Sequence, residues 1–441
     1  MRPGTRSYAD VRLGPVNFRG LTVVLRPPRF DDFADWRRIR LRDRDRIEPH
    51  WFRSPLNWEH RHTAAHWVHE CLTARTEAAA GKRVATVLEI DGRFAGQIEL
   101  LGIEAGAAEA SAWVDGQVAR RGAAGLAVAL LIDFGFGSVG LDRITAPISV
   151  ANPAARRVIH QRWTREAVMA GYFDTGSGRV DHELWAVTRD RVPAGGLAAD
   201  WSAHVGPVDA TGPGRVVTSR PTISRYTIAR TWSRYQLGRL WHAADPLRAQ
   251  VRGTVRGEHS TVSLRPLRRD DFSARRAARI AAHPVLAATM RREQWARLHT
   301  RREWYRTRMS TRPGLLGKQG VVLVIDVAGR YAGECRLFDR DMFDRNVRAA
   351  LWVSPDAGPD VAVRALRLLV MYATEQLGIW RLAMAVPTAD RAGAEVAHEA
   401  GLRHEGTMHY VRGPGGALAD HELWAFSTSV SAPTSTGEAH P

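Results

Sequence analysis

Residues Trp113 to Phe136 read WVDGQVARRGAAGLAVALLIDFGF, and this stretch decides the fold class. Its start is typical of a strand, a turn of small residues follows around Gly122, and the apolar remainder predicts a helix over 123–140. The first turn of a helix presents unpaired backbone N–H groups and a partial positive charge, which together suit a pyrophosphate. A helix start without any ligand shows the same pattern, so the neighbouring elements must decide.

Around this stretch the sequence predicts the element order β-α-α-β-β-β-α-β-α-β-β. Asp31 or Asp32 is a candidate N-cap for the first helix, and Asp91-Gly92 forms the turn of a hairpin. The predicted elements are a strand at 21–27, helices at 31–44 and 60–80, a hairpin at 83–100, a strand at 109–114, a helix at 123–140, a strand at 142–150, a helix at 152–163, and strands near 165–173 and 179–187.

The same pattern occurs twice in the chain. The hexapeptide DHELWA begins at Asp181 and again at Asp420, 239 residues later. LRPPRFDDF begins at Leu25 and LRPLRRDDF at Leu264, with the same offset. A repeat this long is a duplicated domain rather than a solenoid. We therefore expect a first domain at 15–190, a basic linker at 191–259, a second domain at 260–428 and a disordered tail at 429–441.

The linker combines arginines with aromatic and aliphatic residues. Between Arg215 and Arg256 there are nine arginines and a single acid, Asp245. This spacing predicts an amphipathic helix that packs across both domains, while contact with RNA or with a membrane surface remains an alternative.

The overall composition favours anionic partners. Lysine and arginine number 63 against 46 aspartate and glutamate, which gives a net charge of +17. Such a charge suits a phosphate-rich cofactor, RNA or an anionic membrane face, and a GC-rich genome produces the same arginine bias. No run of about 18 apolar residues and no signal peptide are found. Cys71 and Cys335 stand one in each half, which argues against a disulfide framework and predicts a cytoplasmic protein.

Taken as an ordered set, the motifs resemble the GNAT superfamily of acyl-CoA-dependent N-acyltransferases. More narrowly, they resemble the Rim-type ribosomal-protein alanine/serine N-acetyltransferases. The resemblance covers both halves but not the linker. The matching motifs are Leu25-Arg26-Pro27, the segment from Arg40 to Pro49, Trp113-Val114, Gly122-Ala123-Ala124, Gly140-Leu141-Asp142-Arg143, Asn152-Pro153 and Asp181-His182.

The resemblance implies an α+β fold of two tandem domains, each with three α/β layers. In each domain, helices would flank a mixed, mostly antiparallel sheet of six to seven strands. It also implies acetyl-CoA as co-substrate and no metal, with the pantetheine in a gap between the fourth and fifth strands. A backbone N–H near Val114 would stabilise the carbonyl oxygen. The implied cofactor-binding residues are Trp113, Val114, Arg120, Arg121, Gly122, Ala123, Ala124, Gly125 and Asn152.

Several residues are candidates for the acid and the base of the reaction. The family's serine after the asparagine is Ala155 here, so its role as acid is vacant or taken by another residue. Glu48, Glu166 and His182 are candidate bases, and Tyr172 is a candidate proton donor. Each has a plainer alternative: a solvated surface acid for the glutamates, a structural hydrogen bond for the histidine, and packing for the tyrosine.

The second half departs from the family at the phosphate-binding turn. Alignment of Gly140 with Gly378 puts Asp360 opposite Gly122, where a carboxylate would repel a pyrophosphate. Pro359 removes one N–H donor, and Asp360 is expected to cap the helix instead. We therefore expect a folded second half that does not bind acetyl-CoA and serves structure or substrate docking.

These patterns predict an enzyme that transfers acetyl from acetyl-CoA to a primary amine, with a protein N-terminus as one candidate acceptor. One alternative is a non-catalytic tandem protein that binds RNA or the ribosome, or senses acyl-CoA. Another is a small-molecule amine acyltransferase. The acceptor, the acyl chain and the oligomeric state do not follow from the sequence.

Overall fold

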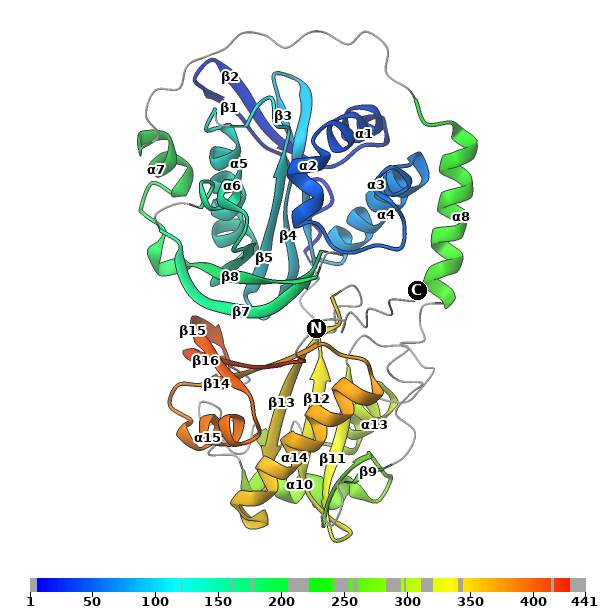
Figure 1. Ribbon diagram of the computed structural model, residues 1–441, viewed down its shortest axis with the longest axis vertical. Coiled ribbons are helices and arrows are strands. Elements are labelled where there is room, and N and C mark those ends of the chain that lie inside the picture. The colour runs from blue at the N-terminus through cyan, green and yellow to red at the C-terminus, as the bar shows by residue number, and fades with distance from the viewer. Residues whose placement is uncertain are drawn as a thin grey trace, which may run out of the picture. The chain divides into compact units, whose positions relative to one another are not determined.

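The chain forms two compact units, which Figure 1 shows in a computed structural model. The first consists of Met1–Val168, His182–Ala243 and Thr407–His421, and the second contains Met169–Asp181, Ala244–Gly406 and Glu422–Pro441. Arg120 and the predicted disordered tail lie outside the described residues. The structure describes residues 6–119, 121–159, 162–175, 178–204, 222–241, 254–256, 261–282, 295–296, 299–310, 320–339, 344–413 and 416–428.

The sheet of the first unit runs in the order β1-β2-β3-β4-β5-β6-β8. Successive strands pair antiparallel except β5 and β6, which are parallel, so the sheet is mixed and mostly antiparallel as expected. The first strand, β1, was not predicted. The strands are β1 Leu13–Phe18, β2 Leu21–Arg26, β3 Val84–Ile90, β4 Arg93–Glu104, β5 Ala107–Val114, β6 Arg143–Ser149, β7 Thr164–Asp174 and β8 Arg179–Thr188.

Helices cover both faces of this sheet (Figure 1). The long apolar helix α5 packs on one face with the larger core cluster, and α1 to α4 pack on the other over a cluster rich in tryptophan. Successive residues of a strand point to opposite faces, so one strand serves both cores. The helices are α1 Phe33–Arg42, α2 Arg44–Ile47, α3 Trp58–Arg61, α4 Ala64–Ala79, α5 Ala123–Phe134 and α6 Pro153–Arg156, with 3-10 turns η1 Phe30–Asp32 and η2 Glu48–His50.

Two predicted helices differ from the structure. The helix predicted over 123–140 ends at Phe134 and continues as a π-helical turn, η3, over Gly135–Val139. The helix predicted over 152–163 is wrong in length, because α6 covers only Pro153–Arg156. Asn152 caps α6 and Pro153 suits its first position, but the C-cap Arg157 is followed by turn and not by a further helical turn.

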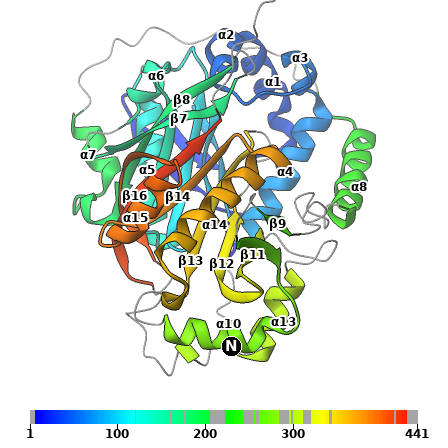
Figure 2. The same cartoon turned by 60° about the horizontal axis from the view of Figure 1, so that its bottom comes forward.

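The second unit repeats the order, with strands running β16-β14-β13-β12-β11-β10-β9 (Figure 2). Its long helix α14 ends in a π-helical turn, as α5 does. The elements are β9 Val255–Arg256, β10 Val262–Pro266, α10 Asp271–Ala281, α13 Arg301–Ser310, β11 Val321–Val327, β12 Arg330–Phe338, β13 Asn346–Val353, η5 Pro355–Ala357, α14 Pro359–Met371, η6 Tyr372–Gln376, β14 Arg381–Pro387, α15 Arg391–Glu399, β15 Arg403–Arg412 and β16 Leu418–Ser427.

The two LRP motifs are structural. The buried guanidinium of Arg26 pairs with both oxygens of Asp32, at 2.7 and 2.9 Å, and with Glu89 at 2.6 Å. Arg265 makes the same contacts with Asp271 and Asp326 in the second half. A buried arginine that has all its partners fixes the strand to the helix that follows it.

The repeated hexapeptide is structural too. Trp185 donates its indole N–H to Glu183 at 3.0 Å, and Trp424 donates to Glu422 at 2.8 Å. Asp181 Oδ1 accepts from the N–H of Gly171, whose φ is +54°. The second copy has the same bond, from Tyr410 to Asp420. In each half, DHELWA therefore stabilises the last two strands and the residue with positive φ in the first of them.

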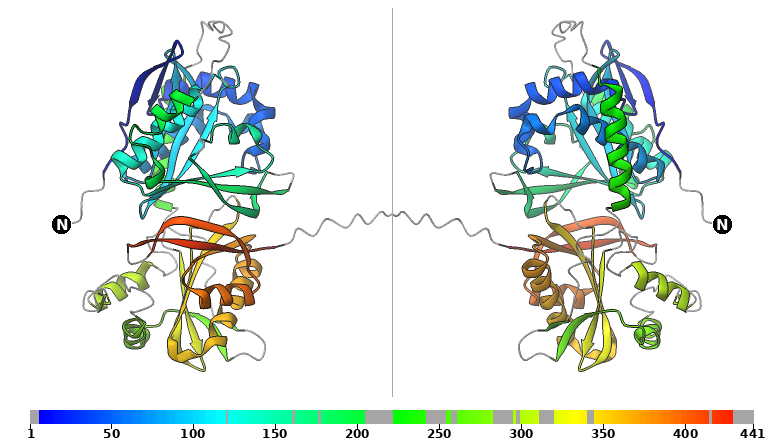
Figure 3. Two further views of the ribbon diagram at one scale, coloured as in Figure 1. Left: turned by 90° about the vertical axis from the view of Figure 1, so that its left-hand side faces the viewer. Right: turned by 90° about the vertical axis from the view of Figure 1, so that its right-hand side faces the viewer.

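The predicted linker contains two helices in the described residues, α7 Leu197–His204 and α8 Arg225–Trp241. Helix α8 packs on α4 of the first unit, where His69 and Tyr235 meet edge to face at 5.2 Å (Figure 3). Its outer side exposes Tyr226 and Trp232. Among the helices of the described residues, none is long and apolar enough to cross a bilayer.

Candidate active site

The sheet of the first half opens between its two parallel strands. β5 and β6 pair only from Ala107–Arg143 to Glu109–Thr145, although β5 continues to Val114 and β6 to Ser149. Beyond Glu109, β5 remains paired with β4 on its other side. The backbone groups of β5 that face β6 are therefore left for a ligand along the last five residues of the strand.

The helix that follows β5 begins beside this opening. Gly122 is its N-cap with φ +78°, a left-handed conformation that favours glycine. The first turn, from Ala123, contains no acidic residue, and glycine offers no side-chain cap. The N-terminal amides of α5 are therefore suited to an anion, as the sequence indicated. Arg121 lies next to this turn, and Arg120 falls outside the described residues.

Helix α7 holds this turn from behind, a role that the sequence did not reveal. Trp201 donates its indole N–H to the carbonyl oxygen of Gly122 at 3.0 Å. A Cβ built on Gly125 would lie 1.9 Å from the ring of Trp201, so only glycine fits there. Asp133 of α5 in turn accepts from the N–H groups of Leu197 and Ala198 at the start of α7. Both glycines of the turn are thus required by packing or by backbone conformation.

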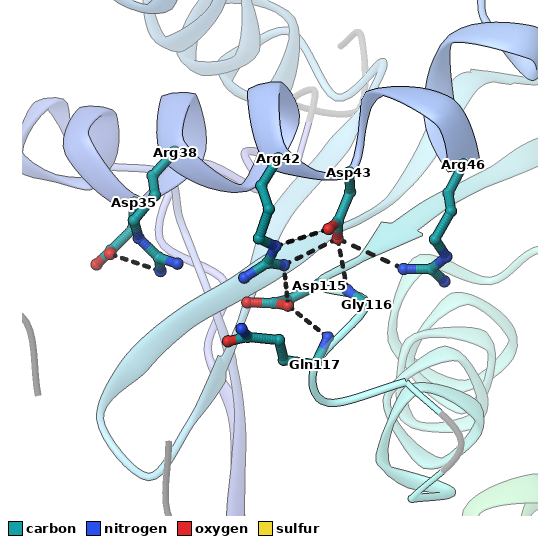
Figure 4. A network of polar contacts seen from close by, with 8 residues as sticks. All are labelled: Asp35, Arg38, Arg42, Asp43, Arg46, Asp115, Gly116 and Gln117. Atoms are coloured by element: carbon teal, nitrogen blue, oxygen red, sulfur yellow. Dashed lines mark hydrogen bonds and ion pairs between the residues drawn. The ribbon is translucent and has the colours of Figure 1, made fainter. Parts of the chain in front are cut away.

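An ionic network joins helix α1 to the loop after β5 (Figure 4). Asp43 accepts from the backbone N–H of Gly116 at 2.6 Å and from Arg42. Arg42 also bonds Asp115, which accepts from the N–H of Gln117 at 2.7 Å. Burial alone would raise the pKa of Asp43, but these donors outweigh it and lower that pKa. The carboxylate thus positions the loop that leads from β5 to Gly122.

A second cluster lies under the end of β5, on the face covered by α1 to α4. Trp113 donates its indole N–H to Gln97 at 2.8 Å, and Gln97 donates to Glu70 at 2.6 Å. The guanidinium carbon of Arg40 lies 4.1 Å from the ring centre of Trp113 and 3.9 Å from that of Trp51. The predicted site residue Trp113 is therefore held by its hydrogen bond to Gln97 and contacts the buried cation of Arg40.

The candidate bases lie in different surroundings. Glu48, in η2, is 33% exposed and pairs with Arg44 at 2.5 Å. Glu166 is 1% exposed, and both of its oxygens bind Arg143, one of them at 2.6 Å. Arg381 and Glu405 form the equivalent pair in the second half. The repetition indicates a structural role for Glu166.

The remaining candidates are strand residues. His182 is buried in β8, opposite Ser149 of β6. Tyr172 lies in β7, in the segment Met169–Asp181 that belongs to the second unit, and its carbonyl oxygen accepts from Asn346 at 2.7 Å. Asn152 uses its side-chain oxygen to cap α6 through the N–H of Ala155 at 3.0 Å. The structure therefore does not bring Tyr172 and Glu48 together in one unit.

The corresponding turn of the second half differs from the prediction. Its helix α14 has Gly358 as N-cap with φ +84°, so Gly358 rather than Asp360 is the counterpart of Gly122. The expectation that Asp360 caps the helix is wrong, since its side chain is 80% exposed and lies 3.5 Å from Arg364. Pro359 does occupy the first helical position and removes one N–H donor.

A family model described as the acetyltransferase (GNAT) domain matches residues 22–161. RimJ of Mycobacterium smegmatis, solved in complex with CoA-disulfide, is 31% identical, with 44% of this chain and 94% of that one covered and a TM-score of 0.43. No curated protein matches the chain.

Two further solved structures share less sequence. A ribosomal-protein-S5-alanine acetyltransferase from Vibrio fischeri is 16% identical over 41% of this chain and all of that one, with a TM-score of 0.31. RimL, a ribosomal L7/L12 α-N-protein acetyltransferase in complex with CoA, is 13% identical over 40% of this chain and 98% of that one, with a TM-score of 0.32. The family model and the 31% identity to RimJ carry the assignment: the chain belongs to the GNAT acetyltransferases.

Proposed function

We propose that the first half transfers an acetyl group from acetyl-CoA to a primary amine, with protein N-termini as the first acceptors to test. The observation that carries this proposal is the opening between β5 and β6, which lies beside the Gly122 start of α5. Acetyl-CoA supplies the reactive thioester. The amine nitrogen forms the new C–N bond as the C–S bond breaks, a base takes the amine proton, and an acid returns a proton to the thiolate.

Glu48 is the base that we assign to this reaction. It is the partly exposed carboxylate among the candidates, whereas both oxygens of Glu166 already bind Arg143. A carboxylate that can reach water can accept the amine proton through that water. Glu48 also begins η2, three residues before Trp51, whose ring lies over the guanidinium of Arg40.

We infer a structural or docking role for the second half. Pro359 removes a donor at its helix start, and no arginine pair equivalent to Arg120-Arg121 precedes Gly358. In the first half an aspartate, Asp43, fixes the loop after β5, but the residue 239 positions later is Ala282. The second half thus lacks two features that hold an anion-binding turn in place.

Calorimetric titration of acetyl-CoA tests whether the first half binds acetyl-CoA and whether the second half does not. We expect one site per chain, loss of binding in Gly122→Asp, and unchanged binding in Gly358→Asp. A carboxylate at the first glycine would repel the pyrophosphate, whereas the same change in the second half would affect no ligand. Thiol release from acetyl-CoA with N-terminal peptides then measures the reaction. Two sites, or a loss in Gly358→Asp only, would overturn the assignment of roles.

An anionic partner is the second candidate, because α8 exposes Tyr226 and Trp232 together with Arg225, Arg230 and Arg234. Aromatic and basic side chains on one exposed helix suit RNA. If RNA binding is the main function, RNA affinity will fall steeply with salt, Trp232→Ala will weaken it, and no amine will be acetylated.

A further inference from the structure

Arg40 is a buried cation, and two of its three guanidinium nitrogens lack a hydrogen-bond partner in the described part of the chain. Arg40 is 2% exposed, and its Nε and Nη1 atoms have no hydrogen-bond partner among the described residues. Trp51 and Trp113 lie within stacking distance of the guanidinium. Aromatic rings interact with the faces of a guanidinium, but its five N–H donors point outward in its plane. The rings therefore leave its hydrogen-bonding capacity unused.

The second half contains the same arginine with its partner in place. Arg279 is the counterpart of Arg40, because Trp295 donates to its carbonyl oxygen at 2.8 Å and Trp58 donates to that of Arg40 at 2.8 Å. Arg279 lies 5.5 Å from the ring centre of Trp352. Its Nη2, however, donates to Glu334 at 2.5 Å. A carboxylate therefore fits at this place and binds one end of the guanidinium, although the Nε of Arg279 has no partner among the described residues.

In the first half that carboxylate is replaced by Gln97. Gln97 pairs with Trp113 across β4 and β5, and Glu334 pairs with Trp352 in the same register. Both polar ends of Gln97 are used, since its oxygen accepts from Trp113 and its nitrogen donates to Glu70. An amide also carries no charge, so Gln97 cannot replace the anion that Glu334 supplies.

The two halves also differ at a second position near this arginine, where Glu70 corresponds to Thr307. Glu70 follows the buried Trp67 by three residues, and Thr307 follows the buried Trp304 by three. Glu70 accepts from Gln97 at 2.6 Å, whereas Thr307 donates to Glu303 at 2.8 Å. In the first half the internal acid thus forms its hydrogen bond with the glutamine, and its charge acts on Arg40 without a hydrogen bond.

We propose that Arg40 is the acceptor-binding residue of the first half and takes a carboxylate carried by the amine substrate. The proposal rests on the proposed function. Arg40 contacts Trp113, the neighbour of Val114, at the end of β5 where the strand opening places the thioester. A cation held in a low-dielectric site and left unpaired is costly, so an anion that arrives with the substrate is bound strongly. The substrate class is an amine with a nearby carboxylate: an amino acid or an acidic peptide N-terminus.

The charge state of Arg40 agrees with this role. Burial lowers the pKa of Arg40 to about 9, which still leaves the guanidinium protonated at neutral pH. The cation therefore remains available to a carboxylate under ordinary assay conditions.

Matched pairs of acceptors test the proposal through thiol release from acetyl-CoA. The pairs are alanine with alaninamide, and amidated tetrapeptides Ala-Glu-Ala-Ala with Ala-Gln-Ala-Ala. For at least one pair we expect kcat/KM to be roughly tenfold or more higher for the acid, because a hydrogen bond to a charged group is lost in the amide. The preference should disappear in Arg40→Met and weaken in Arg40→Lys. Arg38→Met, on the exposed side of the same helix, should keep it.

A graft from the second half provides the converse test. Gln97→Glu combined with Glu70→Thr gives the first half the acidic arrangement that surrounds Arg279. This variant should have a higher melting temperature than the natural protein, since it pairs a buried charge, and it should lose the preference for acids.

A binding measurement that needs no acetyl transfer tests the carboxylate site at Arg40 separately from the proposed reaction. Thermal denaturation with glutarate, compared with glutaramide, should show stabilisation by the acid only, and none in Arg40→Met. Equal effects of acid and amide, or stabilisation that persists in Arg40→Met, would overturn the role of Arg40. If acids stabilise the protein through Arg40 but no amine is acetylated, the proposed reaction fails while the carboxylate site stands.

Discussion

The indole N–H of Trp201 donates a hydrogen bond to the carbonyl oxygen of Gly122, over 3.0 Å. A helix from the predicted linker thus fixes the carbonyl that precedes the anion-binding turn. Trp201→Phe keeps the ring but removes the donor. We expect it to lower the free energy of unfolding by about 1 kcal/mol and to weaken acetyl-CoA binding severalfold, because the turn loses an anchor.

Trp185→Phe is the matched control for Trp201→Phe. It also removes an indole hydrogen bond, but this one goes to Glu183 in the same strand and not to the turn. It should cost similar stability and leave acetyl-CoA affinity unchanged in calorimetry. Equal losses of affinity in both variants would contradict a specific role for Trp201.

Asp43 should control the loop that leads to the turn. Asp43→Asn retains an oxygen for the N–H of Gly116 but removes the charge that holds Arg42 and Arg46. We expect KM for acetyl-CoA to rise about tenfold with a smaller change in kcat, since the loop is displaced rather than the reacting groups. Asp35→Asn, on the same helix but paired with exposed Arg38, should change neither constant.

Substitution of the two glutamate candidates, Glu48 and Glu166, should affect the stability of the protein differently. Glu166→Gln removes the charge that pairs with the buried Arg143 and should cost about 3–5 kcal/mol of stability in denaturant unfolding. Glu405→Gln should destabilise the second half in the same way, with little effect on turnover. Glu48→Gln should instead leave the melting temperature nearly unchanged and lower kcat by a factor of about 100. A fully active Glu48→Gln protein would exclude Glu48 as the base.

Stability should depend on pH through His62. Burial lowers the pKa of His62 to about 4 in the folded protein, while the unfolded chain keeps a pKa near 6.5. Between these values the unfolded state binds more protons, so folding stability falls as pH drops from 6.5 towards 4. The expected loss at pH 5 relative to pH 8 is about 2 kcal/mol from this residue.

His62→Phe keeps a ring between Trp36 and Trp58 and removes the titration. The pH dependence of the melting temperature between 5 and 8 should become shallower in this variant. His299 has the equivalent lowered pKa, about 4, so part of the slope should persist. An unchanged slope would show that other groups dominate the acid response.

The repeat of the motifs, the order of most elements along the chain and the glycine-bearing turn could be predicted from local patterns. The alternation of apolar residues fixes which face of a strand is buried, and the repeat of LRP and DHELWA fixes the period. The role of Trp201 could not be predicted, because its contact with Gly122 spans 79 residues and no local pattern encodes it. The N-cap of α14 was misplaced because α14 is one residue longer than α5 and Leu377 adds one more residue between its π turn and Gly378, so a fixed offset from Gly378 failed.

The importance of Arg40 was also hidden within a longer motif. In the sequence it is one of several arginines between Arg37 and Arg46, and most of these lie at the surface. A signal was present, however, in the two aligned hairpins: DGRFAGQ has an amide where AGRYAGE has an acid. Only the structure shows that this difference leaves a buried cation without a hydrogen-bonded carboxylate.

Helices α5 and α14 both end in a five-residue π turn, Gly135–Val139 and Tyr372–Gln376, although these two segments have no residue in common at equivalent places. A π turn holds one residue more than an α turn and is rare. Two independent origins at the same point of two copies would be a coincidence. We infer that the extra residue was already present in the single domain from which both halves derive.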